Sequence, residues 1–262
     1  MTQNRGSFFS AMPPVTKNLL IINAIVWLAS MILPGKLGID FIELGGLHYW
    51  NATDFNPVQL FTYMFMHSTD SIAHLFFNMF TLFMFGTTLE RVLGAKRFIF
   101  YYISCGIGAA LIQEIVWTLS INDFISNGQE IVIANWATGN NLTLSRAHEL
   151  INTNPALASQ LADVTDQIMN SLVTVGASGA IYGILLAFGM LFPNLPLYLL
   201  FIPFPIKAKW MVMGYGAIEL LLGLSTANDG VAHFAHLGGM IFGLIMILYW
   251  KRNGTLRNNG YY

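Results

Sequence analysis

Residues 231–250 read VAHFAHLGGMIFGLIMILYW and are mostly apolar. An α-helix rises about 1.5 Å per residue, so a helix of this length covers roughly the 30 Å of the hydrocarbon layer of a bilayer. The stretch therefore predicts a transmembrane helix. Five further apolar windows of similar length lie at 17–33, 70–87, 97–118, 173–192 and 208–225.

The six windows predict an all-α, polytopic membrane protein with a six-transmembrane-helix bundle. In lipid each backbone polar group must be paired within its own segment, and the windows lack the alternation that is typical of barrel strands. The chain is 55% hydrophobic and 10% charged, whereas soluble domains usually carry about a quarter charged residues. No polar linker divides it, so 1–262 is expected to form one membrane domain.

Charge and cysteine content exclude several classes of partner and site. The formal net charge is −1 and the pI about 6.6, so no overall basic field exists to hold nucleic acid through its phosphates. The single cysteine, Cys105, can form no intramolecular disulfide and no cluster of thiolate metal ligands. The bilayer is the expected environment, and the chain can act as a monomer or an oligomer.

The basic residues predict the direction of the bundle. Of the twelve Lys and Arg residues, only Lys36 and Arg146 fall on the second face of a six-span topology. Both termini should therefore be cytoplasmic, with the protein in a bacterial inner (cytoplasmic) membrane. The other ten are Arg5, Lys17, Arg91, Lys96, Arg97, Lys207, Lys209, Lys251, Arg252 and Arg257.

Two segments on the outer side are long, namely about 34–69 and 119–172. The second is polar, and its part from Pro155 to Leu172 has apolar residues at helical spacing. We expect it to be an external loop insertion with one or two short helices outside the membrane.

Among the polar side chains inside the apolar windows, four stand out: His74, Asn78, Ser178 and His236. A polar group is costly in lipid, which makes each a functional candidate. Windows two, four and six all run from the outer to the inner side, and these residues follow their outer ends by about four to eight positions. At 1.5 Å per residue, the four side chains share a layer roughly 6 to 12 Å below the outer surface.

Small residues predict that two of these helices approach closely. Gly179 and Gly183 in the fourth window, and Gly239 and Gly243 in the sixth, are small-xxx-small pairs. Taken alone such pairs more often serve plain helix packing. Here they would let an imidazole reach the Ser178 hydroxyl, accept its proton and return it to a leaving amine.

The same layer offers donors for a developing oxyanion. These are the Asn78 amide, the His74 ring N–H and the Ser178 backbone N–H. Tyr182 lies one turn after Ser178 and could pack on the His236 ring.

No acidic residue is expected in this layer. Glu114 and Glu219 lie on the third and fifth windows, and Asp229 lies in the loop before the sixth. The sequence therefore predicts a Ser178/His236 dyad without a third member, and leaves Glu219 as a hydrogen-bonded core residue or part of a proton path.

A metal site and a transporter are the competing interpretations. His233 and His236, with His74, could form a metal cluster, but no His-Glu-x-x-His motif exists and no carboxylate is expected to join them. We expect no metal and no organic cofactor. A small transporter should show inverted repeats or broken helices, and neither pattern is present.

These residues, taken together, resemble the rhomboid family of intramembrane serine proteases, in motif order, from Pro57 to about Trp250 apart from the third loop. The motifs are Phe65-Met66-His67, His74 with Asn78, Gly86 through Glu90-Arg91 to Gly94, Gly176-Ala177-Ser178-Gly179, and Ala235-His236-Leu237-Gly238-Gly239.

The resemblance implies specific roles for these residues. Ser178 would be the nucleophile, His236 the base, and His74, Asn78 and the Ser178 amide the groups around the oxyanion. Tyr182 would stack on His236. Gly176, Gly179 and Gly239 would support the site.

The resemblance also implies the substrates and the rival function. Single-span membrane proteins would be cut near the outer end of a helix that unwinds easily, with the fifth span and the loop from Ser225 to Gly230 as gate and cap. The long third loop exceeds the usual family connection, and we hypothesise that it serves substrate docking, partner binding or oligomer contacts. The alternative is an inactive rhomboid-like protein that binds membrane clients, although such relatives usually lack the Ser or the His.

Overall fold

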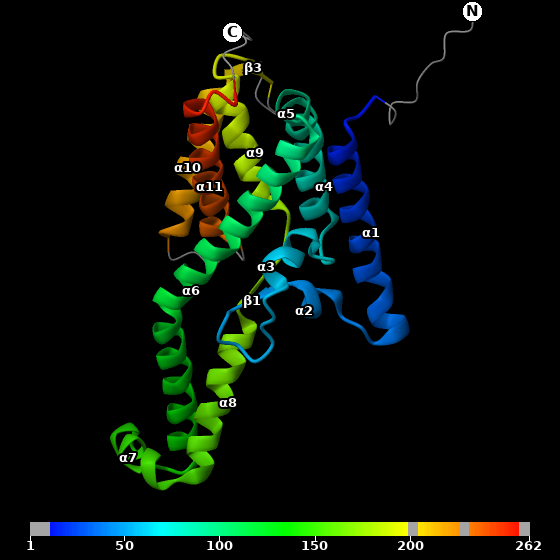
Figure 1. Cartoon of the computed structure of the whole chain (residues 1–262). Coiled ribbons are helices and arrows are strands. Elements are labelled where there is room, and N and C mark those ends of the chain that lie inside the picture. Colours follow the sequence, from blue (N-terminus) through cyan, green and yellow to red (C-terminus); the bar gives the residue numbers. More distant parts are fainter. Residues whose placement is uncertain (1–10, 199–203, 226–230, 257–262) are drawn as a thin grey trace, which may run out of the picture.

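The computed structural model describes residues 11–198, 204–225 and 231–256, and most of them are helical (Figure 1). Some residues used in the sequence interpretation lie outside this part of the chain, namely Arg5, Asp229, Arg257 and positions 226–230 of the expected cap.

The described helices confirm an all-α polytopic membrane fold. Four of them are long and apolar enough to cross a bilayer, at 14–37, 72–93, 95–139 and 233–252. A shorter apolar helix, Ser178–Leu191, takes the place of the fourth window, and a 16-residue helix, Ala208–Gly223, takes that of the fifth. The count of six spans stays a prediction. The elements are α1 (Pro14–Leu37), α4 (Ile72–Thr81), η3 (Leu82–Gly86), α5 (Thr87–Leu93), α6 (Ala95–Gly139), α9 (Ser178–Leu191), α10 (Ala208–Gly223) and α11 (His233–Arg252).

A carboxylate from α5 fixes the start of α1. Glu90 accepts hydrogen bonds from the backbone N–H groups of Val15 (2.9 Å) and Thr16 (2.7 Å) and from the Thr16 hydroxyl (2.8 Å). The first N–H groups of a helix lack partners within the helix, and negative charge is favourable there. Glu90 thus caps α1 from a neighbouring helix and holds the two together at one end of the bundle.

The first loop is joined to the segment before α9 by a short strand pair. It contains α2 (Phe41–Gly45), β1 (Leu47–His48), α3 (Gln59–Thr62) and the 3-10 helix η2 (Tyr63–Phe65). Strand β1 pairs antiparallel with β2 (Val173–Thr174), so that Leu47 faces Thr174. This pairing places the loop directly beside the entry to α9. A second two-residue pair, β3 (Pro196–Leu197) with β4 (Ile206–Lys207), lies between α9 and α10.

Helix α6 continues far beyond the span predicted at 97–118 and ends only at Gly139. No proline occurs between Ala95 and Pro155, so nothing in the sequence stops the helix at the expected membrane boundary. The chain then returns through α7 (Leu144–Leu150), η4 (Ile151–Thr153) and α8 (Pro155–Ser171). The expected helix at 155–172 is present, but the first part of the expected loop is a helix as well.

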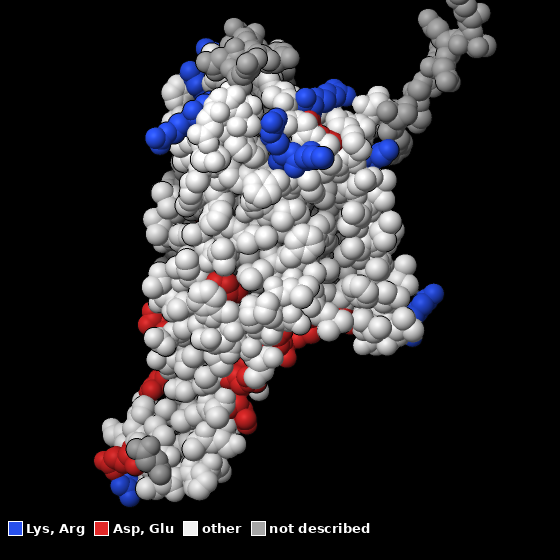
Figure 2. All heavy atoms as spheres, viewed as in Figure 1, with Lys and Arg blue, Asp and Glu red and all other residues white. Residues whose placement is uncertain are grey.

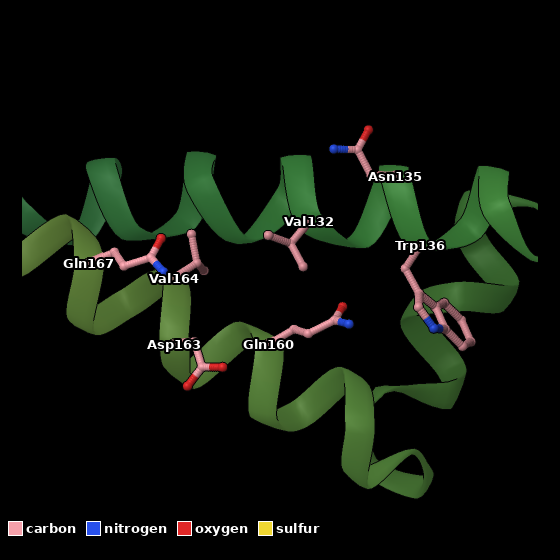
Figure 3. Close-up of a pocket in the computed structure, with 7 residues that line it drawn as sticks. All are labelled: Val132, Asn135, Trp136, Gln160, Asp163, Val164 and Gln167. Carbon is pink, nitrogen blue, oxygen red and sulfur yellow. The ribbon is translucent and has the colours of Figure 1, made fainter.

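The far part of α6 and α8 form a hairpin that projects from the bundle (Figure 1). It has a small apolar core of its own around Ile133, Leu157 and Leu161. Gln129 Nε2 donates to Thr165 Oγ1 at 3.0 Å between the two helices. Figure 3 shows a shallow pocket between them, lined by Val132, Asn135, Trp136, Gln160, Asp163, Val164 and Gln167. The external position of this hairpin stays a prediction.

The surface of the bundle is apolar along its middle. Large apolar side chains such as Ile25, Phe77 and Ile245 are more than half exposed. Figure 2 shows Lys and Arg mainly at the end of the bundle where α5 lies and α11 ends, with an uncharged band below and most carboxylates toward the hairpin. This pattern is typical of a protein whose middle faces lipid.

Candidate active site

Ser178 occupies the first position of α9, directly after a backbone turn that requires glycine. Gly176 has φ +125°, a conformation that side chains strongly disfavour, and its N–H donates to the carbonyl of Tyr63 at 2.9 Å. A Cβ at this position would lie 2.8 Å from His74 Nε2 and 3.6 Å from Ser178 Oγ. The turn therefore brings His74 to the serine, and it leaves the Ser178 N–H at a helix start, where backbone donors lack partners within the helix.

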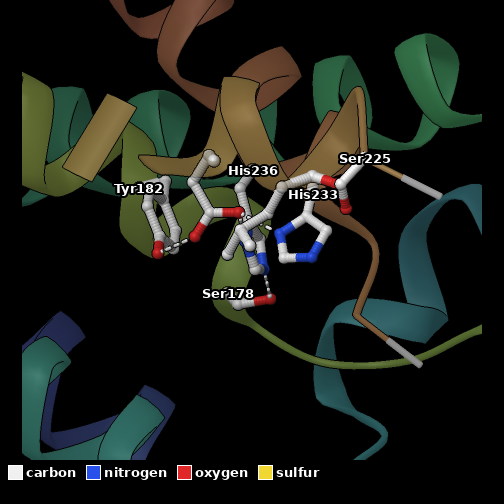
Figure 4. A network of polar contacts seen from close by, with 7 residues as sticks. Ser178, Tyr182, Ser225, His233 and His236 are labelled. Carbon is white, nitrogen blue, oxygen red and sulfur yellow. Dashed lines mark hydrogen bonds and ion pairs between the residues drawn. The ribbon is translucent and has the colours of Figure 1, made fainter. Parts of the chain in front are cut away.

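The Ser178 hydroxyl and the His236 ring meet between two helices. His236 Nε2 lies 2.8 Å from Ser178 Oγ, and Figure 4 marks this hydrogen bond. A Cβ on Gly239 would lie 1.8 Å from the carbonyl oxygen of Gly179. The absence of side chains at these two glycines is therefore what lets α9 and α11 approach so closely.

Tyr182 packs on His236 from α9. Its ring is nearly parallel to the imidazole, with 4.3 Å between the ring centroids and an angle of 9° between the planes. The predicted contact between the two rings is confirmed. The Tyr182 hydroxyl also donates a hydrogen bond to Oε1 of Glu219 on α10.

The prediction that no acidic residue enters this layer was wrong. Glu219 Oε2 lies 2.9 Å from Nδ1 of His236 and 2.7 Å from Nδ1 of His233. The shared depth of His74, Asn78, Ser178 and His236 follows from helices that run inward, whereas α10 runs the opposite way. Counted back from the end of α10 at Gly223, Glu219 lies about one turn below the same surface, and this count could have found it.

The expectation that no carboxylate joins the histidines is corrected by the same contact. Potential ligand atoms of Glu219, His233 and His236 all lie within 4.8 Å of one another, and this donor set is suited in kind to a zinc ion. His74 is not part of that group. The two histidines and the carboxylate are all buried.

His74 and Asn78 lie on α4, whose His74 side chain reaches the turn directly before Ser178. His74 contacts the Gly176 turn as described above, and Asn78 lies one turn farther along the helix and is buried. The His67 ring, in the loop before α4, lies 5.2 Å from the His74 ring. Burial, together with the neighbouring His74, lowers the pKa of His67 to about 4.

A family model described as Rhomboid domain matches residues 54–128 and 132–253. The matched ranges include each of the side chains placed around Ser178. No curated protein matches the chain.

Proposed function

The chain belongs to the rhomboid family, a family of intramembrane proteases, and we propose on this premise that it is a serine endopeptidase that hydrolyses peptide bonds in or near transmembrane segments of other membrane proteins. The observation that carries the proposal is the 2.8 Å hydrogen bond between His236 Nε2 and Ser178 Oγ. A serine is a weak nucleophile unless a base accepts its proton, and a neutral imidazole in this position is such a base.

The reaction has two halves. As Ser178 Oγ bonds to the substrate carbonyl carbon, its proton passes to His236 Nε2 and the carbonyl electron pair moves onto oxygen. When the C–N bond breaks, the same proton passes to the leaving amine and an acyl-enzyme remains. Water then attacks the ester carbon with His236 again as base, releases the carboxylic acid and restores the serine.

The negative oxygen needs donors fixed before the reaction. The Ser178 backbone N–H at the start of α9 is one, and the side chains of His74 and Asn78 on α4 are the others that this proposal assigns. Donors in a buried site are worth more than in water, and losing one from such a site typically costs about 10²- to 10³-fold in kcat.

The proposed substrates are single-span proteins. A peptide bond inside a transmembrane helix is hydrogen-bonded and shielded, so Gly or Pro near the outer end of the substrate helix would favour its opening. Leu221 on α10 and Leu224 directly after it are apolar and exposed. Such side chains are suited to contact with lipid or with an incoming substrate helix. We place the lateral entry at α10.

The proposed topology has both termini in the cytoplasm of a bacterium and the site opening to the outer face. The gathering of basic residues at one end of the bundle supports this direction, since positive residues favour the cytoplasmic side (Figure 2). The serine and histidine lie toward the opposite end, where α9 and α11 begin.

The function is tested with purified protein in liposomes and a panel of single-span model substrates that carry Gly or Pro near the outer helix end. The proposal expects cleavage by the wild type and none by Ser178→Ala or His236→Ala. Stable substrate binding without cleavage by the wild type would instead favour the inactive, client-binding alternative. Solute flux that persists in Ser178→Ala would favour a transporter.

A further inference from the structure

Glu219 connects α10 to the two helices that carry the serine and the histidine. Its Oε1 accepts the hydroxyl of Tyr182 on α9, and its Oε2 lies 2.9 Å from His236 Nδ1 on α11. Oε2 also lies 2.7 Å from His233 Nδ1, one turn earlier on α11. One carboxylate oxygen thus contacts Tyr182 and the other contacts both imidazoles, while Ser178 contacts the opposite ring nitrogen of His236.

We propose that Glu219 is a positioning residue for the proposed protease, which holds the proton of His236 on Nδ1 and so keeps the lone pair of Nε2 directed at Ser178 Oγ. The inference rests on the proposed function and deepens it from a dyad to a serine, histidine and carboxylate arrangement. A neutral imidazole carries one proton, and the nitrogen that keeps it is set by the partner of that nitrogen. A carboxylate beside Nδ1 accepts but does not donate, so it favours the tautomer with a bare Nε2.

The same carboxylate stabilises the charge that catalysis creates. When Nε2 takes the serine proton, the ring becomes an imidazolium with N–H groups on both nitrogens. Glu219 stays ionised beside Nδ1 throughout, and the proton on Nε2 goes to the leaving amine, so no proton is transferred to Glu219. Less than a tenth of Glu219, His233 and His236 is exposed, and the low dielectric of such a place strengthens this attraction.

Tyr182 and His233 hold the carboxylate in turn. Tyr182 binds Oε1 of Glu219 through its hydroxyl while its ring stacks on His236. This one side chain therefore positions both the imidazole and the carboxylate beside it. His233 Nδ1 approaches the oxygen that faces His236. The ring of His236 is thus bounded by Ser178, Tyr182 and Glu219 from three directions.

The test compares Glu219→Gln with Glu219→Asp. Gln keeps the shape but loses the charge, and its amide can donate to Nδ1 and move the ring proton to Nε2. Asp keeps the charge but is shorter. We expect kcat to fall on the order of 10⁴-fold in E219Q, the scale seen when the acid of a serine protease triad is removed. The loss of kcat in E219D should be at least about tenfold smaller than in E219Q. A purely structural glutamate would give the reverse order, because Gln preserves the packing better.

Glu114→Gln is the matched control. Glu114 is another fully buried glutamate in a membrane helix, and its Oε2 accepts the backbone N–H of Trp50 at 2.9 Å. Among the ion pairs of the described residues, the carboxylate beside His236 is that of Glu219. E114Q should leave kcat within about threefold of the wild type, which shows that loss of a buried carboxylate alone does not explain the effect at Glu219.

The pH profile gives a second readout. The titratable groups around His236 are Glu219 from α10, Tyr182 from α9, His233 from its own helix and His74 from α4. Removing the carboxylate charge makes the imidazolium less stable, so the acidic limb of kcat/KM should move to lower pH in E219Q and stay in place in E114Q. An unmoved limb in E219Q contradicts the proposal.

A measurement without turnover separates this inference from the proposed function. Nitrogen-15 spectra of histidine-labelled protein in detergent distinguish an imidazole protonated on Nδ1 from one protonated on Nε2, with His236→Gln identifying the signal. The proposal expects Nδ1–H in the wild type and a change of tautomer in E219Q. The Nε2–H form in the wild type would overturn it even in an active enzyme, and an inactive protein with the Nδ1–H form would overturn the function alone.

Discussion

The Tyr182 ring lies parallel to the His236 imidazole with 4.3 Å between the two centroids, and the hydroxyl of the same tyrosine bonds to Glu219. Tyr182→Phe separates these two contacts, because it keeps the stacked ring and removes the hydroxyl. We expect a loss of roughly tenfold to 150-fold in kcat for Tyr182→Phe, about the value of one hydrogen bond to a charged group, and a larger loss for Tyr182→Ala. Steady-state cleavage rates measure both. Equal rates for the two variants would show that the ring itself does not matter.

Gly239 marks the closest approach of α9 and α11. Gly239→Ala would place a methyl group 1.8 Å from the Gly179 carbonyl oxygen, so the helices must move apart and the bond between Ser178 and His236 must lengthen. We expect loss of cleavage and a destabilisation of about 1 to 3 kcal/mol or more, measured by thermal unfolding in detergent.

The chain supplies a matched control for that substitution. Gly214 on α10 has open space around the position of an added Cβ, so Gly214→Ala should keep wild-type activity and at least wild-type stability. Full activity in Gly239→Ala would contradict the close helix contact.

Because the buried His67 is hard to protonate in the folded state, we expect the protein to lose stability in acid. Its pKa is about 4 in the folded protein because of burial, against 6.5 for an unperturbed histidine. The unfolded chain therefore takes up a proton below about pH 6.5 while the folded protein does not. The free energy of unfolding is therefore unaffected by this group above pH 6.5. It decreases by up to about 3 kcal/mol as the pH falls toward 4.

Thermal unfolding at pH 7.5, 5.5 and 4.5 measures this dependence. The melting temperature of the wild type should fall over that range, and His67→Gln should flatten the dependence. Parallel curves for the two proteins would show that His67 is not the group responsible.

The helical hairpin can be removed to test the hypothesis that it serves docking, partner binding or oligomer contacts. A Cβ at Gly128 on α6 would lie 2.4 Å from Ile168 on α8, so the two cut ends of a 125–168 deletion lie close together and a short Gly-Ser linker can join them. We expect Ser178 to keep its reactivity toward a small probe, because its surroundings come from α4, α9, α10 and α11. Unchanged cleavage of every membrane substrate and an unchanged oligomeric state would remove the hypothesis.

The sequence predicted those parts of the site that follow from helix direction and glycine spacing. Ser178, His236 and Tyr182 could be brought together because α9 and α11 run the same way and meet at glycines. Glu219 was missed because α10 runs the opposite way, so its depth had to be counted from the other end. A residue's layer depends on the direction of its helix as well as on its position in the apolar window.

The length of α6 could not be predicted from apolarity alone. Its second half packs on α8 through Ile133 and Ala137, and the helix persists because backbone hydrogen bonding continues in the absence of a breaker. Apolar windows locate the part of a helix that can lie in the bilayer, whereas prolines and caps set where it ends. The short loop strands β1 and β2 could not be predicted either, because two residues are too few to show the alternation of polar and apolar side chains that is typical of a strand.

The central claim is that His236 activates Ser178 as a nucleophile, and labelling of the purified protein by a serine-reactive fluorophosphonate tests it most directly. The account predicts covalent labelling of the wild type at Ser178, none in Ser178→Ala, and a labelling rate at least about 10²-fold lower in His236→Ala. Wild-type protein that stays unlabelled, or that is labelled equally fast without the His236 imidazole, would contradict it.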